Sequence, residues 1–263
     1  MNKKSLYLSS FFLFCVGTFT TTQARAAKLI CLNDRAVQPT TVFLFAHGIT
    51  RSSDTAIKQA QTYIESNIIM NTCYTFDFGD GLRTINLGQE PDCALFASAY
   101  AQVLEKHHDA HIILIGLSRG AVTILNTMAL HPELDWQRTK GVILESPYAN
   151  VSAMAEQIAS SYMFFVPFKA TIMRKLIDWL PSYKPDGIQP IEMISKIKVD
   201  VPFLIAYSEA DKTVPAAGTR MLIDKLQSAG HRVTSWSCQK GKHSTLGSNA
   251  AFSQAAREFL SKQ

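Results

Sequence analysis

A serine between two glycines is the part of this sequence with the clearest capacity for chemistry. The run Gly116-Leu117-Ser118-Arg119-Gly120 follows an apolar, β-branched stretch, and a segment of helical spacing begins at Ala121. A serine at a sharp turn from strand to helix presents its hydroxyl above a sheet, and glycines two residues to either side let the turn close. The pattern therefore predicts Ser118 as a nucleophile, with the amide of Arg119 as a hydrogen-bond donor to a developing oxyanion.

A serine hydroxyl is a weak nucleophile and needs a base that is itself oriented by a third group. Asp211 lies on a loop after the apolar run 203–207, and His243 lies on a loop after the run 232–238. The chain order is therefore Ser, Asp, His, which predicts His243 as the general base and Asp211 as its orienting acid. Glu209 and Glu145 are the alternative acids, and we expect Glu145 instead to anchor the entry of the insertion that follows it.

A second oxyanion donor is expected on the loop Ala46-His47-Gly48-Ile49, which follows the strand-like run 42–45. Gly48 allows close approach of the backbone, and the amide of Ile49 is the predicted donor. We expect His47 and Gly48 to border the substrate. His47 precedes the nucleophile in the chain, so it is expected to be a structural hydrogen-bonding residue and not the base.

The surrounding segments alternate between short apolar runs and longer segments with apolar residues three and four apart. This alternation predicts one α/β domain with a mostly parallel central sheet flanked by helices. The predicted strands are 28–32, 42–46, 73–78, 111–115, 141–145, 202–207 and 232–238. The predicted helices are 56–68, 93–107, 121–128, 217–228 and 253–260.

One interval, about 149–199, breaks the alternation with an apolar, aromatic-rich segment and several prolines. Large apolar side chains are too frequent there for a solvated loop, so we expect a short helical lid over the site. Phe164, Phe165 and Phe168 are the predicted contacts to an apolar acyl group. Ordinary core helices are the alternative.

The first 26 residues have the layout of a secretory signal peptide: Lys3 and Lys4, an apolar run, then Ala24-Arg25-Ala26. We expect cleavage near Ala27, an exported protein that is periplasmic or secreted, and no stable membrane insertion afterwards. An uncleaved anchor is the alternative. Residues 1–26 contain three basic and no acidic side chains, so their removal lowers the net charge from +5 to +2. A nearly balanced chain gives no reason to expect nucleic acid or an anionic membrane as a partner.

Four cysteines follow this leader: Cys31, Cys73, Cys93 and Cys238. An even count in an exported chain predicts two disulfides, with all three pairings open. Buried free thiols are one alternative. A zinc site is another, although the sequence has no C-x-x-C pair.

These motifs together resemble the α/β-hydrolase superfamily, and within it the small serine-aminopeptidase-like and lysophospholipase-like esterases. The resemblance covers nearly all of residues 27–263 and extends to Leu144-Glu145-Ser146-Pro147-Tyr148, at the end of a strand. In such proteins the acid is spaced from a Val-Pro pair as Asp211 is from Val214-Pro215, which favours Asp211 over Glu209. Phe76-Asp77-Phe78-Gly79 is similar to the family's D-x-R-G loop but lacks its arginine.

The resemblance implies a serine hydrolase that cleaves small carboxylic esters through an acyl-enzyme, without metal or organic cofactor, and the signal peptide predicts that it is exported. A serine peptidase acting on amides is the second enzymatic alternative. A catalytically silent binding protein of the same fold is a third. The sequence does not define the oligomeric state.

Overall fold

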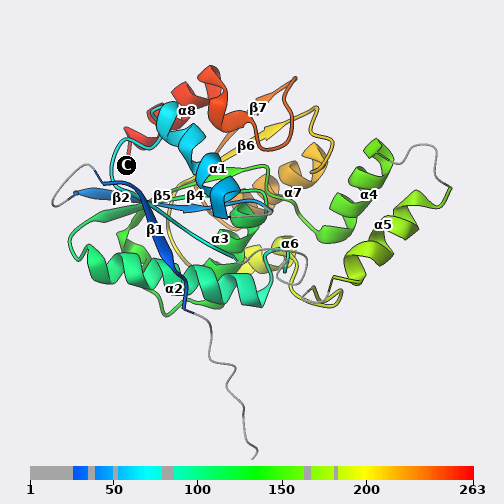
Figure 1. Cartoon of the computed structure of the whole chain (residues 1–263), viewed down its shortest axis with the longest axis horizontal. Helices are drawn as coiled ribbons and strands as arrows, with labels where there is room; N and C mark the ends of the chain where they lie inside the picture. Colours follow the sequence, from blue (N-terminus) through cyan, green and yellow to red (C-terminus); the bar gives the residue numbers. More distant parts are fainter. Residues whose placement is uncertain (1–25, 35–38, 50–52, 79–85, 163–166, 181–182) are drawn as a thin grey trace, which may run out of the picture.

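A seven-stranded sheet forms the centre of the computed structural model, which describes residues 26–263 apart from 35–38, 50–52, 79–85, 163–166 and 181–182 (Figure 1). The strand order is β1-β3-β2-β4-β5-β6-β7, and only the edge strand β1 runs antiparallel to its neighbour. The strands are β1 (Leu29–Asn33), β2 (Thr41–Ala46), β3 (Cys73–Phe76), β4 (His111–Leu117), β5 (Thr139–Glu145), β6 (Phe203–Ser208) and β7 (Val233–Cys238). All seven predicted strands are present, with ends shifted by two residues at most.

Helices cover both faces of this sheet. Side chains of α1 and α8 pack with one face, and those of α2, α3 and α7 pack with the other. The helices are α1 (Ser53–Glu65), α2 (Glu90–Lys106), α3 (Arg119–Leu130), α4 (Val151–Tyr162), α5 (Lys169–Asp178), α6 (Pro190–Met193), α7 (Ala216–Ser228) and α8 (Ala250–Leu260), with short 3₁₀ turns η2 (Trp136–Arg138), η3 (Ile194–Lys196) and η4 (Leu246–Ser248). The five predicted helices are confirmed as α1, α2, α3, α7 and α8.

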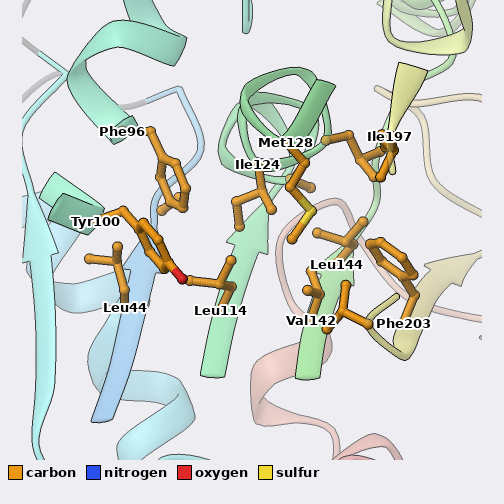
Figure 2. Close-up of a cluster of buried hydrophobic side chains, with 14 of the residues drawn as sticks. Leu44, Phe96, Tyr100, Leu114, Ile124, Met128, Val142, Leu144, Ile197 and Phe203 are labelled. Carbon is orange, nitrogen blue, oxygen red and sulfur yellow. The ribbon is translucent and has the colours of Figure 1, made fainter. Parts of the chain in front are cut away.

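The central strands are buried on both faces, which explains why they are continuously apolar in sequence. Every residue of β4 after His111 is buried, and α3 has buried side chains almost all round because it lies directly over this strand. Figure 2 shows the larger core between the sheet and α2 and α3, where Leu44, Leu114 and Val142 meet Ile124 and Met128. This rigid centre holds the carboxyl ends of the parallel strands in place.

The interval 149–199 contains α4, α5 and α6, as expected for a helical insertion. Figure 1 shows α4 and α5 side by side at one end of the molecule. Val151 and Met154 of α4 are buried in a small apolar cluster with Val122 of α3 and with Leu87 and Val214, which lie on loops of the domain. The inner face of the insertion is thus attached to the domain near the loop that carries Asp211.

The prediction of two disulfides is wrong, because Cys31, Cys73, Cys93 and Cys238 are all free thiols. Cys31 lies opposite Tyr74 in the β1–β3 ladder, so Cys73, the residue next to Tyr74, points to the other face of the sheet. Cys93 lies on α2, and Cys238 ends β7 at the opposite edge of the sheet. Burial raises the pKa of the Cys73 and Cys93 thiols, so both are inert apolar groups.

Within the described part of the chain, no helix has both the length and the apolar character needed to span a membrane. The proposed signal peptide falls almost entirely within residues 1–25, outside the described residues.

Candidate active site

The turn that carries Ser118 depends on two close backbone approaches. Ser118 has φ 52° and ψ −112° between β4 and α3, a strained conformation for a residue with a side chain. A Cβ at Gly120 would lie 2.0 Å from the carbonyl oxygen of Ala46, and one at Gly116 would lie 2.6 Å from Cα of Ala121. Only glycine fits at both positions, so these residues allow the turn that presents the Ser118 hydroxyl.

Three loops bring a hydroxyl, an imidazole and a carboxylate into a continuous hydrogen-bonded chain. His243 Nε2 lies 2.9 Å from Ser118 Oγ, and His243 Nδ1 lies 2.7 Å from Asp211 Oδ2. The Asp211 side chain is 2% exposed and the His243 side chain 19% exposed. This arrangement can remove the serine proton and stabilise the resulting imidazolium.

Asp211 is held in its ionised form by its surroundings. Burial alone would raise its pKa, but the hydrogen bond and charge of His243 and the amides of Val214 and Thr213 outweigh burial and lower it. Those two amides both donate to Oδ1, at 3.0 and 2.8 Å, which leaves Oδ2 for His243. The carboxylate therefore has one oxygen for its own loop and one for the imidazole.

The two alternative acids lie elsewhere. Glu209 accepts two 2.7 Å hydrogen bonds from Arg220 on α7. Glu145 is buried at the end of β5 and accepts from the Tyr63 hydroxyl and, at 3.0 Å, from the amide of Leu246. Both ring nitrogens of His243 are engaged with Asp211 and Ser118, so neither of these carboxylates orients the imidazole.

The expected role of Glu145 at the insertion entry is wrong. Its partners are α1 and the turn η4, which follows His243, so Glu145 anchors the histidine loop. The sequence pattern gave no sign of this, because Leu246 lies 101 positions away and donates through its backbone. Burial raises the pKa of the Glu145 carboxyl.

Ser208 joins the acid loop to the histidine loop. Its hydroxyl donates to the Gly241 carbonyl at 3.0 Å and accepts from the Ala210 amide at 3.2 Å. A glycine at this position could make neither hydrogen bond. The Ser208 side chain thus cross-links the two loops that supply Asp211 and His243.

The loop after β2 lies directly against the nucleophile. A Cβ at Gly48 would be 3.6 Å from Cβ of Ser118. His47 Nδ1 contacts the Gly48 carbonyl at 2.7 Å, and the Phe78 amide donates to His47 Nε2 at 3.4 Å, so the proton is on Nδ1. Since a trans peptide directs its N–H opposite to its C=O, fixing the Gly48 carbonyl also fixes the direction of the Ile49 amide.

Burial of His47 should make stability sensitive to acid. Burial is the main reason that its pKa falls from 6.5 to about 4. The unfolded chain thus takes up this proton first, and stability present above pH 6.5 is lost as the pH falls toward 4. We expect the free-energy difference in urea unfolding between the native protein and His47→Asn to shrink by about 2 kcal/mol from pH 7 to pH 5. A difference independent of pH would contradict the neutral buried imidazole.

The Arg119 side chain, beside the nucleophile, forms a buried ion pair that the sequence pattern did not indicate. Its Nε donates to Asp92 Oδ2 at 2.7 Å, and the side chains are 1% and 0% exposed. The guanidinium also lies 4.4 Å from the ring centre of Phe78, and the Gly88 amide donates to the same carboxylate. The ion pair thus fixes the start of α3 to the start of α2.

Removing either partner alone should be costly, because the other charge would stay buried. We expect Asp92→Ala and Arg119→Met each to lower the free energy of unfolding by about 3–5 kcal/mol. The double variant should lose less than the sum of the two, which urea denaturation of all four proteins would measure as a coupling energy. Additive losses would mean that the pair does not act as a unit.

Comparison with known proteins places this geometry in a family. The model of the prolyl oligopeptidase family matches residues 81–261, which include Ser118, Asp211 and His243. The chain belongs to the prolyl oligopeptidase family. No curated protein sequence matches it.

Solved structures establish the fold of this family member as that of the α/β-hydrolases. An esterase of Pyrococcus furiosus superposes with a TM-score of 0.65 at 14% identity, over 94% of this chain and 95% of that one. A Staphylococcus aureus protein described as a putative esterase gives 0.65 at 13% identity, over 89% and 80%. The Pyrococcus horikoshii acylaminoacyl peptidase gives 0.58 at 15% identity, over 90% of this chain and 39% of that longer one.

Of the three aromatic residues predicted to contact the substrate, only Phe168 can be placed. Phe164 and Phe165 lie outside the described residues of this prolyl oligopeptidase family member. Phe168 is 84% exposed at the start of α5, where its ring faces solvent. The side chain that does link the insertion to the site is Gln157 of α4, which donates to the Asp211 carbonyl at 3.1 Å.

Across the described ranges, no group of three or more His, Cys, Asp or Glu side chains is arranged to hold a metal ion. The polar side chains next to Ser118 instead form hydrogen bonds with each other and with backbone amides: His243 contacts Ser118 and Asp211, and Asp211 accepts from the Thr213 and Val214 amides.

Proposed function

We propose that this family member is an exported serine hydrolase that cleaves carboxylic esters. The observation that carries the proposal is the hydrogen-bonded chain from Ser118 Oγ through His243 to Asp211, at 2.9 and 2.7 Å. Such spacing permits proton transfer in both directions during acyl transfer.

The reaction begins when Ser118 Oγ attacks the ester carbonyl and its proton passes to His243 Nε2. The amides of Arg119 and Ile49 donate to the resulting oxyanion, and His243 then gives the proton to the departing alcohol. Water, deprotonated by His243, attacks the acyl-enzyme and releases the acid. Asp211 stays ionised and stabilises the imidazolium in both halves.

Apolar acyl groups are the proposed substrates, and α4 supplies the argument. It contributes Val151 and Met154 to an apolar cluster with Val214 of the acid loop, and Gln157 holds the Asp211 carbonyl. We propose that this helix acts as a wall of the acyl site, in the position of a lid. Peptide hydrolysis is the second candidate, favoured by the family match and by the acylaminoacyl peptidase structure.

A fluorophosphonate probe tests for the activated serine directly. We expect one labelled residue, Ser118, and loss of labelling in His243→Ala, because the probe reports the basicity that the imidazole supplies. An unlabelled native protein would favour a catalytically silent binding protein. Hydrolysis rates for nitrophenyl acetate, nitrophenyl octanoate and aminoacyl nitroanilides would then rank ester against amide, and equal rates on the two esters would contradict an apolar acyl site.

A further inference from the structure

Helix α5 carries an apolar stripe that no part of the described chain covers. Phe168, Ile172, Leu176 and Trp179 are 84%, 38%, 53% and 84% exposed. Spacings of four and three residues place Ile172, Leu176 and the C-cap residue Trp179 on one side of the helix, and Phe168 is exposed at the N-cap that precedes it. Only three other large apolar side chains are as exposed among the described residues, namely Ile49, Met70 and Met221, so α5 holds an unusual concentration.

The stripe is distinct from the face by which α5 packs on the domain. Met173 and Ile177 are partly buried on the opposite side, and Ile177 packs against the cluster that includes Val151 and Met154 of α4. α5 lies at the end of the molecule in Figure 1, in contact with α4. The helix is therefore already packed on one side, and its outer stripe packs against nothing in the described residues.

Positive charge borders this stripe. At 3.6 residues per turn, Lys169 and Lys175 lie roughly 60° to either side of its centre, whereas Arg174 lies on the far side. The helix has three basic residues and one acidic residue, Asp178. An exposed apolar face with Trp and Phe, bordered by lysines, has the composition of helices that lie in the interface of a lipid bilayer.

We propose that this face of α5 docks on a lipid surface that bears anionic headgroups. Phe168, Leu176 and Trp179 would enter the boundary between headgroups and acyl chains, while Lys169 and Lys175 reach the headgroup charges. A second copy of the chain fits less well. Lysine is depleted in protein interfaces, and a symmetric contact would bring the same lysines together.

Docking through α5 would place the lipid surface next to the α4–α5 pair of the insertion. α5 packs on α4, and Gln157 of α4 donates to the Asp211 carbonyl. Hydrophobic esters that partition into the lipid surface would thus lie next to the insertion and could reach it without passing through the bulk solvent. Binding itself depends only on α5, so it does not require the proposed ester hydrolysis.

Binding to vesicles tests the proposal, with Ser118→Ala as the background of every variant so that no lipid is consumed. We expect this protein to sediment with phosphatidylcholine vesicles containing phosphatidylglycerol, and more weakly with phosphatidylcholine alone. Tryptophan fluorescence should shift to the blue, because Trp179 is 84% exposed whereas Trp136 is buried and Trp236 is partly buried. Lys175→Gln should weaken binding about fivefold, and Leu176→Ser about tenfold.

Two matched controls separate this face from general charge and exposure. Arg174→Gln removes the same charge from the far side of α5, and Met221→Ser removes an apolar side chain 55% exposed on α7. Both should bind vesicles within twofold of the background protein. The proposal is overturned if neither vesicle binds, or if Arg174→Gln weakens binding as much as Lys175→Gln. A dimer in sedimentation velocity that Leu176→Ser abolishes would also overturn it, in favour of a second copy.

Discussion

Ser118→Ala is expected to lower kcat on a nitrophenyl ester by about 10⁶ while the protein remains folded. The reason is that His243 Nε2 would have no hydroxyl to activate, although Asp211 and the oxyanion donors stay in place. Residual hydrolysis about 10³ above that in water should persist from those donors. Steady-state kinetics, with circular dichroism to check the fold, would measure both.

Ser146→Ala is the matched control for this substitution. Ser146 is also buried and also has a left-handed backbone, with φ 51° against 52° for Ser118, and it lies at the end of the neighbouring strand β5. Ser146→Ala therefore places alanine at a similarly buried position with positive φ, as Ser118→Ala does, but it does not remove the nucleophile. Its kcat should stay within a few fold of the native value. Retention of activity within tenfold in Ser118→Ala would refute the nucleophile, and an equal loss in Ser146→Ala would point to a local folding defect.

The sequence was sufficient for the sheet, for the helices between its strands and for the positions of the three loops. Ser118, Asp211 and His243 each follow a parallel strand, and the carboxyl ends of such strands meet at one edge of a sheet. Periodicity and turn residues thus define which loops come together. The glycines around Ser118 predicted the turn because close approach leaves no room for a Cβ.

Side-chain partners far apart in sequence could not be predicted in this way. The Arg119–Asp92 ion pair depends on how α3 packs against α2, and the Glu145 contact to Leu246 ends on a backbone amide. Neither has a periodic signal. The disulfide prediction failed for a related reason: an even count of cysteines carries no information on the direction in which each side chain points from a strand.

The insertion was predicted only in part. Its composition predicted helices, and α4 and α5 are present. Which aromatic residues face inward could not be read from their number. Phe168 precedes α5 as its N-cap and is exposed, while the contacts to the acid loop come from Val151, Met154 and Gln157 of α4.

Asp211→Asn is expected to lower kcat by about 10⁴, for a reason specific to the geometry of this loop. In the native protein Oδ1 accepts from the Thr213 and Val214 amides, and Oδ2 faces His243 Nδ1. Asparagine must keep its oxygen toward the two amides, so its NH₂ group would face the imidazole. An NH₂ donor at Nδ1 forces the proton to Nε2, and His243 would then donate to Ser118 and be unable to accept its proton.

Glu209→Gln provides the control, because it makes the same change two residues earlier on the same loop. Glu209 pairs with Arg220 in solvent, and the loss of an exposed ion pair costs at most about 1 kcal/mol of stability. Its kcat should therefore stay near the native value, and the melting temperatures of both variants would exclude a general loss of fold. A loss confined to Glu209→Gln would move the orienting role to Glu209, whereas a loss confined to Asp211→Asn would tie catalysis to the tautomer that the Thr213 and Val214 amides help to select.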